Sequence, residues 1–544
     1  MDTSIFSLYS HTHLRPHVTP FLVPFGSKML RIEFFASILL CIILPFLFLI
    51  LAKLKTRLNN ISSSSNSTKL PKVYPIFGSI FTILKNKSRR VQWTSEMVLS
   101  TPNLTFTLHR PFGYRQMFTA NAANVQHMLK NNFPNYRKGD VFRKTLKDFL
   151  GDGIFNADGD NWRFQRQVSS HEFNTRSLRN FVETVVDSEL SDRLIPVLKN
   201  AAANKIVIDF QDILQRFAFD NICKIAFGYD PAYLLPSLPQ ARFAVAFESA
   251  LTLISERFNS NIPIIWKIKR ALNIGSEKRL KIVANEVREF AKSIMKEKKQ
   301  ELDESTSKES VDLLSRFLSS GHSDEDFVTD IVISFILAGR DTTSAALTWF
   351  FWLLYNNAEV ENEIVEEIKR TSETTVYEEV KDLVYTHASL CESMRLYPPV
   401  PVDTKSAVNR DVLPDGTVVE KGTRISYHPY AMGRVEKVWG PDWEEFRPQR
   451  WLEDAVEESA RKWSFVGKDN FTYPVFQAGP RICLGKDMAF LQMKRVVAGV
   501  LRRFRVVPVA EKGSEPIYIS DFTSKMKGGF PVRVEERDVD LLQN

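Results

Sequence analysis

The residues best suited to chemistry in this sequence surround one cysteine near the C-terminal end. Phe476, Gly479, Arg481, Cys483 and Gly485 lie within ten residues, directly before a predicted helix. Glycine permits a tight turn, and backbone N–H groups and a helix N-terminus can stabilise negative charge on sulfur. A lone cysteine is usually an inert packing residue. The surrounding Phe, Gly and Arg residues make that role improbable here and indicate a functional thiolate.

A second polar group lies inside a long apolar run. The segment 327–354 predicts a buried helix, yet it contains Ala338, Gly339, Asp341 and Thr342. A buried Asp is costly unless it is used. Gly339 permits close approach of a ligand, and the Thr342 hydroxyl can bond the carbonyl of Ala338 and loosen the helix. Alone, the pattern also fits a Ser/Thr-rich kink in a core helix, but beside the cysteine loop it indicates a second part of one site.

Two arginine motifs accompany these segments. Glu392 and Arg395 stand three residues apart on a predicted helix, and Arg450 follows at a distance. An exposed pair at this spacing would contribute only about 0.2–0.5 kcal/mol. Trp162 and Arg166 stand one helical turn apart and are suitable donors to carboxylates, although such pairs are also common on protein surfaces.

Helical periodicity dominates the chain and indicates a mainly α fold with a minor β part. Helical patterns cover 176–199, 206–228, 240–258, 276–304, 324–356, 358–370 and 484–504. Strand-like pieces cover 103–108, 115–119, 417–419 and 424–428. Without an internal repeat, we expect one large α-rich domain rather than several small ones.

The composition excludes several classes of protein. With 544 residues, 44% of them hydrophobic, the chain can bury a large core, which excludes peptide modules and disordered tails. The net charge of +8 is too mild to indicate a nucleic-acid partner. The cysteines Cys41, Cys223, Cys391 and Cys483 include no CxxC pair, so neither a disulfide scaffold nor a zinc module is indicated. Cys223 and Cys391 are expected to be small packing residues on helices.

The N-terminal region predicts a membrane anchor. Residues 34–52 carry no charge and as a helix would rise ~28 Å, enough to span a bilayer core. No small-residue cleavage site follows, which argues against a signal peptide, and Lys53, Lys55 and Arg57 place the rest of the chain in the cytosol. Residues 1–28 are either a weak organelle-targeting extension or the result of an upstream start, with Met29 as the working initiator; we prefer the second interpretation. The predicted order is an extension over 1–33, an anchor over 34–52, a linker with a Pro-containing hinge over 53–75 and a cytosolic domain over 76–544.

The loop around Cys483 resembles the haem-binding loop of the cytochrome P450 family, which reads FxxGxRxCxG. The resemblance covers about residues 70–534 and implies the cytochrome P450 fold, preceded by an N-terminal transmembrane helix. It implies haem b with its iron ligated by the Cys483 thiolate, and an oxygen-binding groove at Ala338 and Gly339. There Thr342 would hydrogen-bond dioxygen at the iron and Asp341 would open the proton route. The other implied roles are donation to the haem propionates by Trp162, Arg166 and Arg481, formation of the ligand loop by Phe476, Gly479 and Gly485, and a buried structural triad of Glu392, Arg395 and Arg450.

Several stretches narrow the resemblance to plant P450s that hydroxylate fatty acids at the ω end. The stretches are 132–140, 162–175, 212–231, 265–280, 319–354 and 473–490. They look more like the fatty-acid enzymes than like relatives that act on jasmonoyl–amino acid conjugates. The implied reaction is hydroxylation of the terminal methyl group of a fatty acid with O2 and electrons from NADPH. Hydroxylation of jasmonoyl–amino acid conjugates remains the alternative.

A fatty acid requires a closed apolar channel over the iron and a cation near the mouth of that channel. By position in the family, the channel candidates are Phe142, Phe149, Phe247, Phe335, Ala338, Val400, Val402 and Met526. Candidates for the carboxylate partner are Arg143, Lys144 and Lys525, although solvated surface charge is the commoner role of such residues.

The chain carries no GxGxxG loop, flavin motif or P-loop, so it needs a partner that delivers electrons from NADPH. The resemblance implies NADPH–cytochrome P450 reductase. The basic residues after the ligand loop are candidates for a docking face toward this acidic flavoprotein: Lys486, Lys494, Arg495, Arg502, Arg503 and Arg505. Together with the anchor, the resemblance implies a location at the endoplasmic reticulum membrane, in contact with membrane lipid.

Two other functions are weighed against this interpretation. A reductase-independent isomerase or dehydratase of fatty-acid hydroperoxides would also use a haem thiolate, but such relatives depart from the Asp341–Thr342 pattern that is intact here. A membrane haem-binding sensor or scaffold would explain the anchor and Cys483 but not the oxygen groove.

Overall fold

The computed structural model describes Pro45 and residues 70–537, except 172, 174, 240–241, 305–311, 321–323, 372–374, 455–462 and 512. The predicted extension over 1–33 and the predicted anchor over 34–52 lie outside the described residues, apart from Pro45. Within the described part of the chain, no helix is both long and apolar enough to cross a bilayer.

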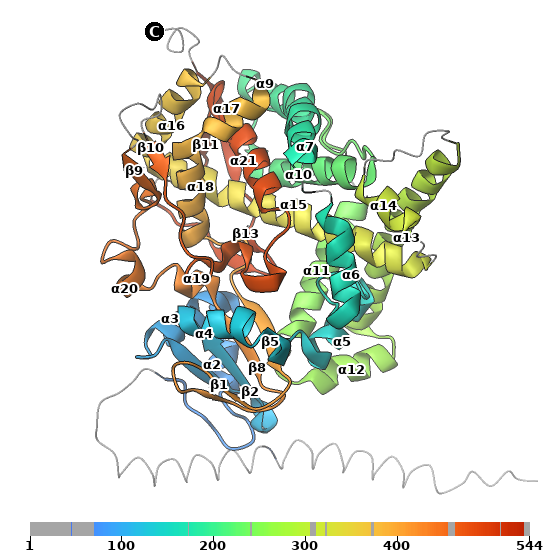
Figure 1. Ribbon diagram of the computed structural model, residues 1–544, viewed down its shortest axis with the longest axis vertical. Helices are drawn as coiled ribbons and strands as arrows, with labels where there is room; N and C mark the ends of the chain where they lie inside the picture. The colour runs from blue at the N-terminus through green and yellow to red at the C-terminus, as the bar shows by residue number, and fades with distance from the viewer. Residues whose placement is uncertain are drawn as a thin grey trace, which may run out of the picture. The chain divides into compact units, whose positions relative to one another are not determined.

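One long helix, α15 (Glu325–Asn356), runs through the middle of the helical region (Figure 1). It begins where the Asp324 side chain accepts hydrogen bonds from the backbone N–H groups of Asp326 and Phe327, which satisfies donors left free at a helix start. Most of its residues are buried, as its nearly uniform apolar character predicts. The helices packed against it include α10 (Phe210–Phe227), α13 (Gly275–Glu304), α18 (Val384–Leu396) and α21 (Lys486–Leu501).

Shorter helices surround this centre. They are α2 (Ile80–Lys85), α3 (Arg90–Leu99), α4 (Ala122–Gln126), α5 (Gly139–Leu150), α6 (Gly159–Ser170), α7 (Thr175–Asn180), α8 (Asp187–Glu189), α9 (Ile195–Ala203), α11 (Arg242–Phe258), α12 (Pro263–Ala271), α14 (Leu313–Ser319), α16 (Ala358–Arg370), α17 (Val376–Asp382), α19 (Pro429–Met432) and α20 (Glu436–Trp439). The helix predicted over 176–199 is a run that stays helical from α7 to α9, through η5 (Phe181–Val186), α8 and η6 (Leu190–Leu194). The predicted mainly α fold with a minor β part is confirmed.

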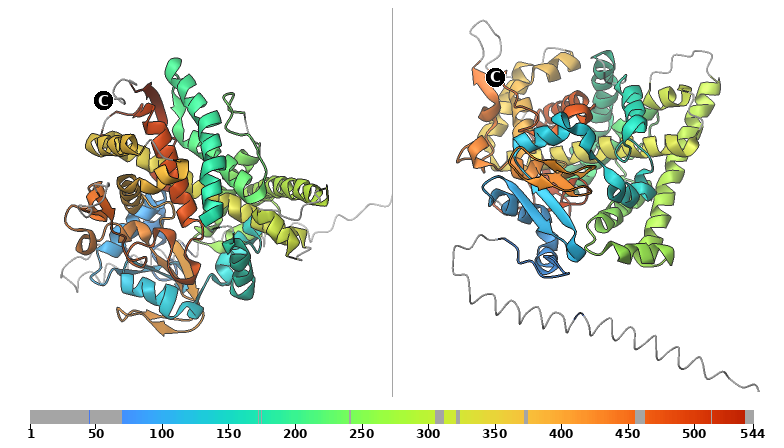
Figure 2. Two further views of the ribbon diagram at one scale, coloured as in Figure 1. Left: turned by 45° about the horizontal axis from the view of Figure 1, so that its top comes forward. Right: turned by 60° about the horizontal axis from the view of Figure 1, so that its bottom comes forward.

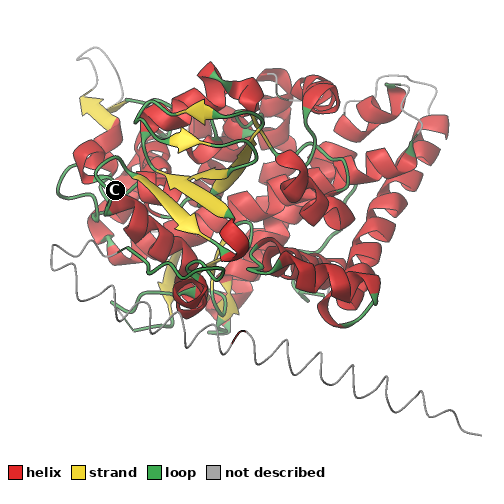
Figure 3. Cartoon of the chain, turned by 90° about the horizontal axis from the view of Figure 1, so that it is seen from below, coloured by secondary structure: helices red, strands yellow, loops and turns green. Residues whose placement is uncertain are grey.

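The strands gather to one side of the domain (Figure 3). The largest sheet has the order β1-β2-β8-β5-β3, in which only the β2–β8 pair is parallel. Its members are β1 (Thr105–His109), β2 (Arg115–Thr119), β3 (Tyr136–Arg137), β5 (Asp403–Ala407) and β8 (Arg424–Tyr427). Figure 2 shows how this pairing places the blue N-terminal strands beside orange strands from late in the chain.

A second sheet and three hairpins complete the β part. The second sheet has the order β11 (Phe504–Pro508), β14 (Pro531–Glu536) and β4 (Ile208–Asp209). The hairpins pair β6 (Asp411–Val412) with β7 (Val418–Val419), β9 (Leu452–Asp454) with β10 (Trp463–Phe465), and β12 (Tyr518–Ser520) with β13 (Ser524–Met526).

Two of the cysteines belong to the core. Cys223 on α10 and Cys391 on α18 are buried and not disulfide-bonded, and each packs within a cluster of apolar side chains. Both therefore have the packing role predicted for them. Cys41 lies outside the described residues.

A buried ion pair joins α18 to the segment that precedes β9. Arg395 donates from Nε and Nη2 to the two carboxylate oxygens of Glu392, each over 2.8 Å, and both side chains are 0% exposed. Arg450 Nε donates to the same carboxylate over 3.2 Å, and the Trp451 indole N–H donates over 2.9 Å. The structure thus brings Glu392, Arg395 and Arg450 together.

The same region holds the segment that leads into the cysteine loop. The Tyr473 hydroxyl donates to the backbone carbonyl of Cys391 on α18 over 2.8 Å. The Tyr473 ring also packs edge-on against Trp451, with 4.7 Å between the ring centroids. Because Trp451 donates to Glu392, the start of the cysteine loop is tied to the buried ion pair.

We expect Glu392→Ala to lower the free energy of unfolding by about 3–5 kcal/mol, because it leaves Arg395 charged and buried without its carboxylate. Urea denaturation followed by tryptophan fluorescence measures the change. Glu444→Ala removes an exposed glutamate from a nearby loop and is the control, with an expected cost below about 0.5 kcal/mol. A cost below about 1 kcal/mol for Glu392→Ala would contradict the structural role.

Candidate active site

A cavity lies between α15 and the cysteine loop. Phe335, Ala338, Gly339 and Thr342 line it from α15, and Cys483 lines it from the loop. Its other walls are mainly apolar and include Ile154, Phe155, Ile222, Ile225, Val400 and Met488. The predicted groove and the predicted thiolate therefore face the same space, although Thr342 and Cys483 are 141 positions apart in the sequence.

The cysteine loop is a tight turn that only glycine fits at one position. Cys483 N–H donates to the carbonyl of Phe476 over 2.8 Å, which closes the loop. Gly479 has a φ of +65°, and a Cβ at this position would lie 1.9 Å from the backbone oxygen of Leu129. Gly485 caps the start of α21. The loop thus presents Cys483 at the cavity surface, next to a helix N-terminus.

The electrostatic surroundings of Cys483 have opposing effects. Burial raises the pKa of the Cys483 thiol above its ordinary value, because burial disfavours the charged thiolate. The backbone N–H of Gly485 and the guanidinium of Arg166 lower this pKa and offset part of the effect. A bound metal ion would favour the thiolate further.

On the opposite wall, α15 is locally modified as the sequence predicts. The Thr342 hydroxyl donates to the Ala338 carbonyl one turn earlier, over 2.7 Å. Gly339 is packed so closely against α10 that a Cβ would lie 2.5 Å from the Ile222 side chain. The small size of Gly339 therefore lets α10 and α15 pack closely, and it also leaves room at the cavity wall.

Asp341 differs from its neighbours because its side chain is buried beside the wall and is not among the lining residues of the cavity. Arg340 Nη1 donates to Asp341 Oδ1 over 2.7 Å. Asp341 Oδ2 is buried without a hydrogen-bond partner among the described residues. Burial raises the pKa of Asp341 to about 6, which Arg340 opposes. Asp341 is thus an acid that can gain or lose a proton near neutral pH.

Cationic and polar side chains line the cavity near Arg481. Trp162 and Arg166 line the cavity from α6, and the Arg481 guanidinium lies 4.5 Å from the centroid of the Trp162 ring. Arg481 Nη2 also donates to Asp158 Oδ1 over 2.8 Å. The three residues expected at the haem propionates therefore lie together.

Two further polar residues of the cavity wall were not predicted from the sequence. Lys138 and Gln477 also line the cavity, and both donate to Asp403, over 3.2 Å from Lys138 Nζ and 2.9 Å from Gln477 Nε2. Lys405 Nζ donates to Asp403 Oδ2, the oxygen that Gln477 also binds, over 2.9 Å. Burial lowers the pKa of Lys405 to about 7, although Asp403 opposes the shift. The FxxGxRxCxG pattern leaves Gln477 unspecified, and no sequence spacing links Lys138 to Asp403.

These residues fit a haem group. A thiol faces the cavity from a glycine-dependent loop, and cationic donors line the cavity for the two carboxylates of the macrocycle. Cys483 would ligate the iron, and Trp162, Arg166, Arg481 and Lys138 would hold the carboxylates. When bound, a haem with a thiolate ligand supplies the electron donation that favours O–O bond cleavage.

The predicted channel residues divide into two groups. Phe335, Ala338 and Val400 line the cavity, whereas Phe142, Phe149, Phe247, Val402 and Met526 are not among its lining residues. Phe149 and Phe247 pack edge to face with centroids 5.2 Å apart, and Phe142 packs in the same manner on Phe258 at 5.5 Å. For both groups, the substrate role stays a prediction.

The candidate carboxylate partners are all engaged with protein acids. Arg143 pairs with Asp152, Lys144 with Asp140, and Lys525 with Glu248. None of the three lines the cavity, whereas Lys138 does.

The structure corrects part of the predicted docking face. Lys494 and Arg495 are buried on α21, and Arg495 pairs with Asp187 and Glu379. Arg502 also pairs with Glu379. These side chains join α21 to the helices around it, because α21 lies inside the domain and not on its surface. Lys486 is half-buried, and only Arg503 and Arg505 of the six predicted bases are exposed.

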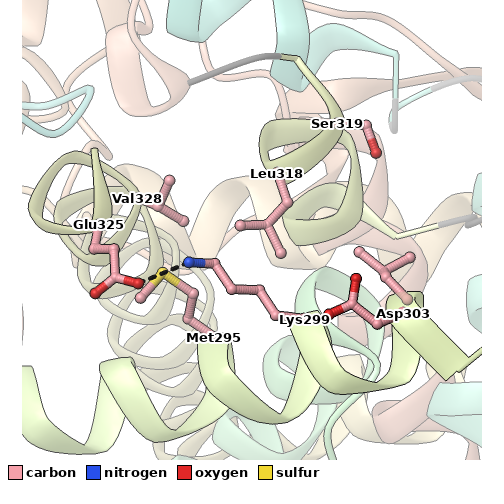
Figure 4. A pocket seen from close by; sticks show the side chains of 8 residues that line it. Met295, Lys299, Asp303, Leu318, Ser319, Glu325 and Val328 are labelled. Atoms are coloured by element: carbon pink, nitrogen blue, oxygen red, sulfur yellow. Dashed lines mark hydrogen bonds and ion pairs between the residues drawn. The ribbon is translucent and has the colours of Figure 1, made fainter. Parts of the chain in front are cut away.

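A second pocket lies apart from the cysteine loop (Figure 4). Its lining comes from Met295, Lys299, Leu302 and Asp303 on α13, Leu318 and Ser319 on α14, and Glu325 and Val328 on α15. Lys299 pairs with Glu325 across it over 2.7 Å. No residue of the predicted site contributes to this pocket.

Comparison with known proteins defines the class. Residues 69–530 match the family described as cytochrome P450, and the chain belongs to that family. It is therefore a haem-thiolate monooxygenase. It is 65% identical to cytochrome P450 94A2 of Vicia sativa over 496 residues, which are 90% of this chain and 96% of the relative. It is also 62% identical to cytochrome P450 94A1 of Vicia sativa, over 87% of this chain and 92% of the relative, and 45% identical to cytochrome P450 94B1 of Arabidopsis thaliana, over 89% and 94%.

We expect Gly479→Ala to lose haem, because the added methyl group would collide with the Leu129 carbonyl and displace the cysteine loop. Gly416→Ala is the matched control: Gly416 has a φ of +83°, with no atom within 4 Å of the position that a Cβ would take, so only backbone strain of about 1–2 kcal/mol is added. Haem per polypeptide and the carbon monoxide difference spectrum measure the effect. Equal haem retention in the two variants would contradict the steric argument.

Proposed function

We propose that the protein hydroxylates fatty acids at the terminal methyl group. The observation that carries the proposal is an apolar cavity with a thiol on one wall and Thr342 on the other, which suits a long hydrocarbon and an oxidising centre. Support also comes from the stretches that resemble plant fatty acid ω-hydroxylases and from the two Vicia sativa relatives, which are clearly more similar than the relative from the 94B group.

Within this function, Thr342 and Asp341 carry the proton. Thr342 lines the cavity, and its hydroxyl can pass a proton to a group bound there. Asp341 is adjacent in α15 and has a pKa near 6, so it can supply that proton at cellular pH. Electrons come from NADPH through a cytochrome P450 reductase.

The test is expression with a plant reductase in microsomes and a product profile from a panel of free fatty acids. We expect the carbon monoxide spectrum of a thiolate-ligated haem and ω-hydroxy fatty acids that form only when NADPH and reductase are present. Products only from jasmonoyl–amino acid conjugates would replace the proposal with the alternative substrate class. Turnover of fatty-acid hydroperoxides without reductase would overturn the monooxygenase assignment.

We also propose that the protein sits at the endoplasmic reticulum membrane, with the segment 34–52 as a single-pass anchor. The folded domain supports contact with lipid, because α12 has no buried residue and exposes Ile264, Ile265 and Ile268. The turn between β1 and β2 exposes Phe112 and Tyr114, and Arg110 at its base donates to the Ser260 carbonyl just before α12 over 3.2 Å. These exposed apolar side chains therefore belong to neighbouring segments.

We expect the domain without residues 1–69 to float with phospholipid vesicles in a density gradient, because the apolar side chains of α12 insert at the interface. Ile264→Glu with Ile268→Glu should reduce the floating fraction severalfold. Val438→Glu, at an exposed apolar position on α20, is the control. Flotation that the α12 substitutions leave unchanged would contradict this membrane contact.

A further inference from the structure

Arg340 stands between two acidic side chains from different helices. Its Nη1 donates to Asp341 Oδ1 on α15 and to Glu248 Oε1 on α11, each over 2.7 Å. The guanidinium is only 4% exposed, and its central carbon lies 5.5 Å from the centroid of the Phe247 ring. Arg340 therefore has two carboxylate partners at equal distance, and a small rotation decides which of them it binds more strongly.

Glu248 has a second cationic partner. Lys525 of β13 pairs with Glu248 Oε2, and its side chain is 12% exposed. Burial would raise the pKa of Glu248, but Arg340 and Lys525 outweigh burial and lower it to about 2. Glu248 thus stays ionised and is shared between a cation on α15 and a cation on the β12–β13 hairpin.

Asp341 is the less satisfied of the two acids. Its Oδ2 has no hydrogen-bond partner among the described residues, and a buried unpaired polar atom is costly. While Arg340 holds Oδ1, the carboxylate stays beside the cavity wall and does not line the cavity. Transfer of Arg340 to Glu248 would free Asp341 to turn toward its neighbour Thr342.

We propose that Glu248 is a positioning residue that draws Arg340 away from Asp341 and so controls when Asp341 can pass a proton toward Thr342. Lys525 opposes it, because Lys525 competes with Arg340 for the Glu248 carboxylate. Glu248 lies on α11 and Lys525 on the β12–β13 hairpin, so a shift of either element would change this competition. This inference rests on the proposed monooxygenase function.

The two partners of the Glu248 carboxylate give variants with opposite expected effects. In Glu248→Gln, Arg340 keeps the hydrogen bond to the Asp341 carboxylate and loses the one to a second carboxylate. The product formed per NADPH should therefore fall about tenfold, a part of the ~10²–10⁴-fold rate enhancement that a positioned acid contributes. The solvent deuterium isotope effect on product formation should rise. In Lys525→Gln, Glu248 binds Arg340 more strongly. The product formed per NADPH, which is the coupling, should therefore be equal to that of the wild type or higher, and the solvent deuterium isotope effect should be smaller.

Two further variants calibrate the assay. Glu256→Gln changes an exposed glutamate on the same helix and should behave as wild type. Thr342→Ala removes the next proton carrier and should consume NADPH while releasing hydrogen peroxide. Turnover driven by an organic hydroperoxide, which needs neither NADPH nor O2, should be nearly the same in Glu248→Gln and wild type, because proton delivery to O2 is then bypassed.

The outcomes separate the proton route from other roles. Equal losses of coupling in Glu248→Gln and Lys525→Gln would overturn the proposal in favour of a merely structural ion network. A loss of hydroperoxide-driven product in Glu248→Gln would overturn it in favour of substrate positioning. If Glu248→Gln does not accumulate as holoprotein, Glu248→Asp retains the charge with a shorter reach and should lower coupling to a lesser degree.

A failure of the proposed function would be recognised separately. If no fatty acid is hydroxylated by the wild type, the fraction of NADPH electrons released as hydrogen peroxide can be measured with any ligand that stimulates NADPH consumption. Glu248→Gln should still raise this fraction and Lys525→Gln should not. An unchanged fraction in Glu248→Gln would overturn the inference independently of the substrate.

Discussion

The burial of the Glu392 carboxylate is the constraint on which the thiol side of the site depends. A carboxylate with no access to water must be satisfied by fixed donors, and Arg395, Arg450 and Trp451 supply them. The segments that carry these donors must therefore lie close to the Glu392 carboxylate. Trp451 in turn packs against Tyr473, from which the chain continues into the cysteine loop. The position of the Cys483 thiol therefore depends on the buried charge of Glu392, which holds the segment before the cysteine loop in place.

Two other buried carboxylates, Asp403 and Asp341, also depend on nearby donors, but to different degrees. Asp403 is bound by Lys138, Lys405 and Gln477, which suits a fixed wall beside a charged group. Asp341, in contrast, has one oxygen bound and one without a partner among the described residues. The Asp403 network, in which both carboxylate oxygens are bound, is suited to holding a ligand in place. The partly satisfied one is suited to changing its protonation state during a reaction.

The sequence predicted the elements whose pattern is long and regular. The central helix and the helices over 206–228, 276–304 and 484–504 were predicted within a few residues, because an apolar stripe sustained over many turns has few other solutions. Short helices such as α12 were not predicted, because nine residues hold too few turns for the helical period to stand out. The prediction that Lys494 and Arg495 on α21 belong to a docking face was wrong. Charged residues usually lie on a protein surface, but the buried Arg495 is neutralised by Asp187 and Glu379 from other segments.

What the sequence alone determined is local. The glycine at 479, the cysteine at 483 and the bond from Thr342 to Ala338 depend on backbone geometry over a few residues, so their motifs carry the information. The tertiary structure alone decided that Lys138 lines the cavity and that Glu248 shares Arg340 with Asp341. The physical reason is that a charge can be buried only beside a partner. Any of many acids and bases along the chain could be that partner until the helices and strands are packed.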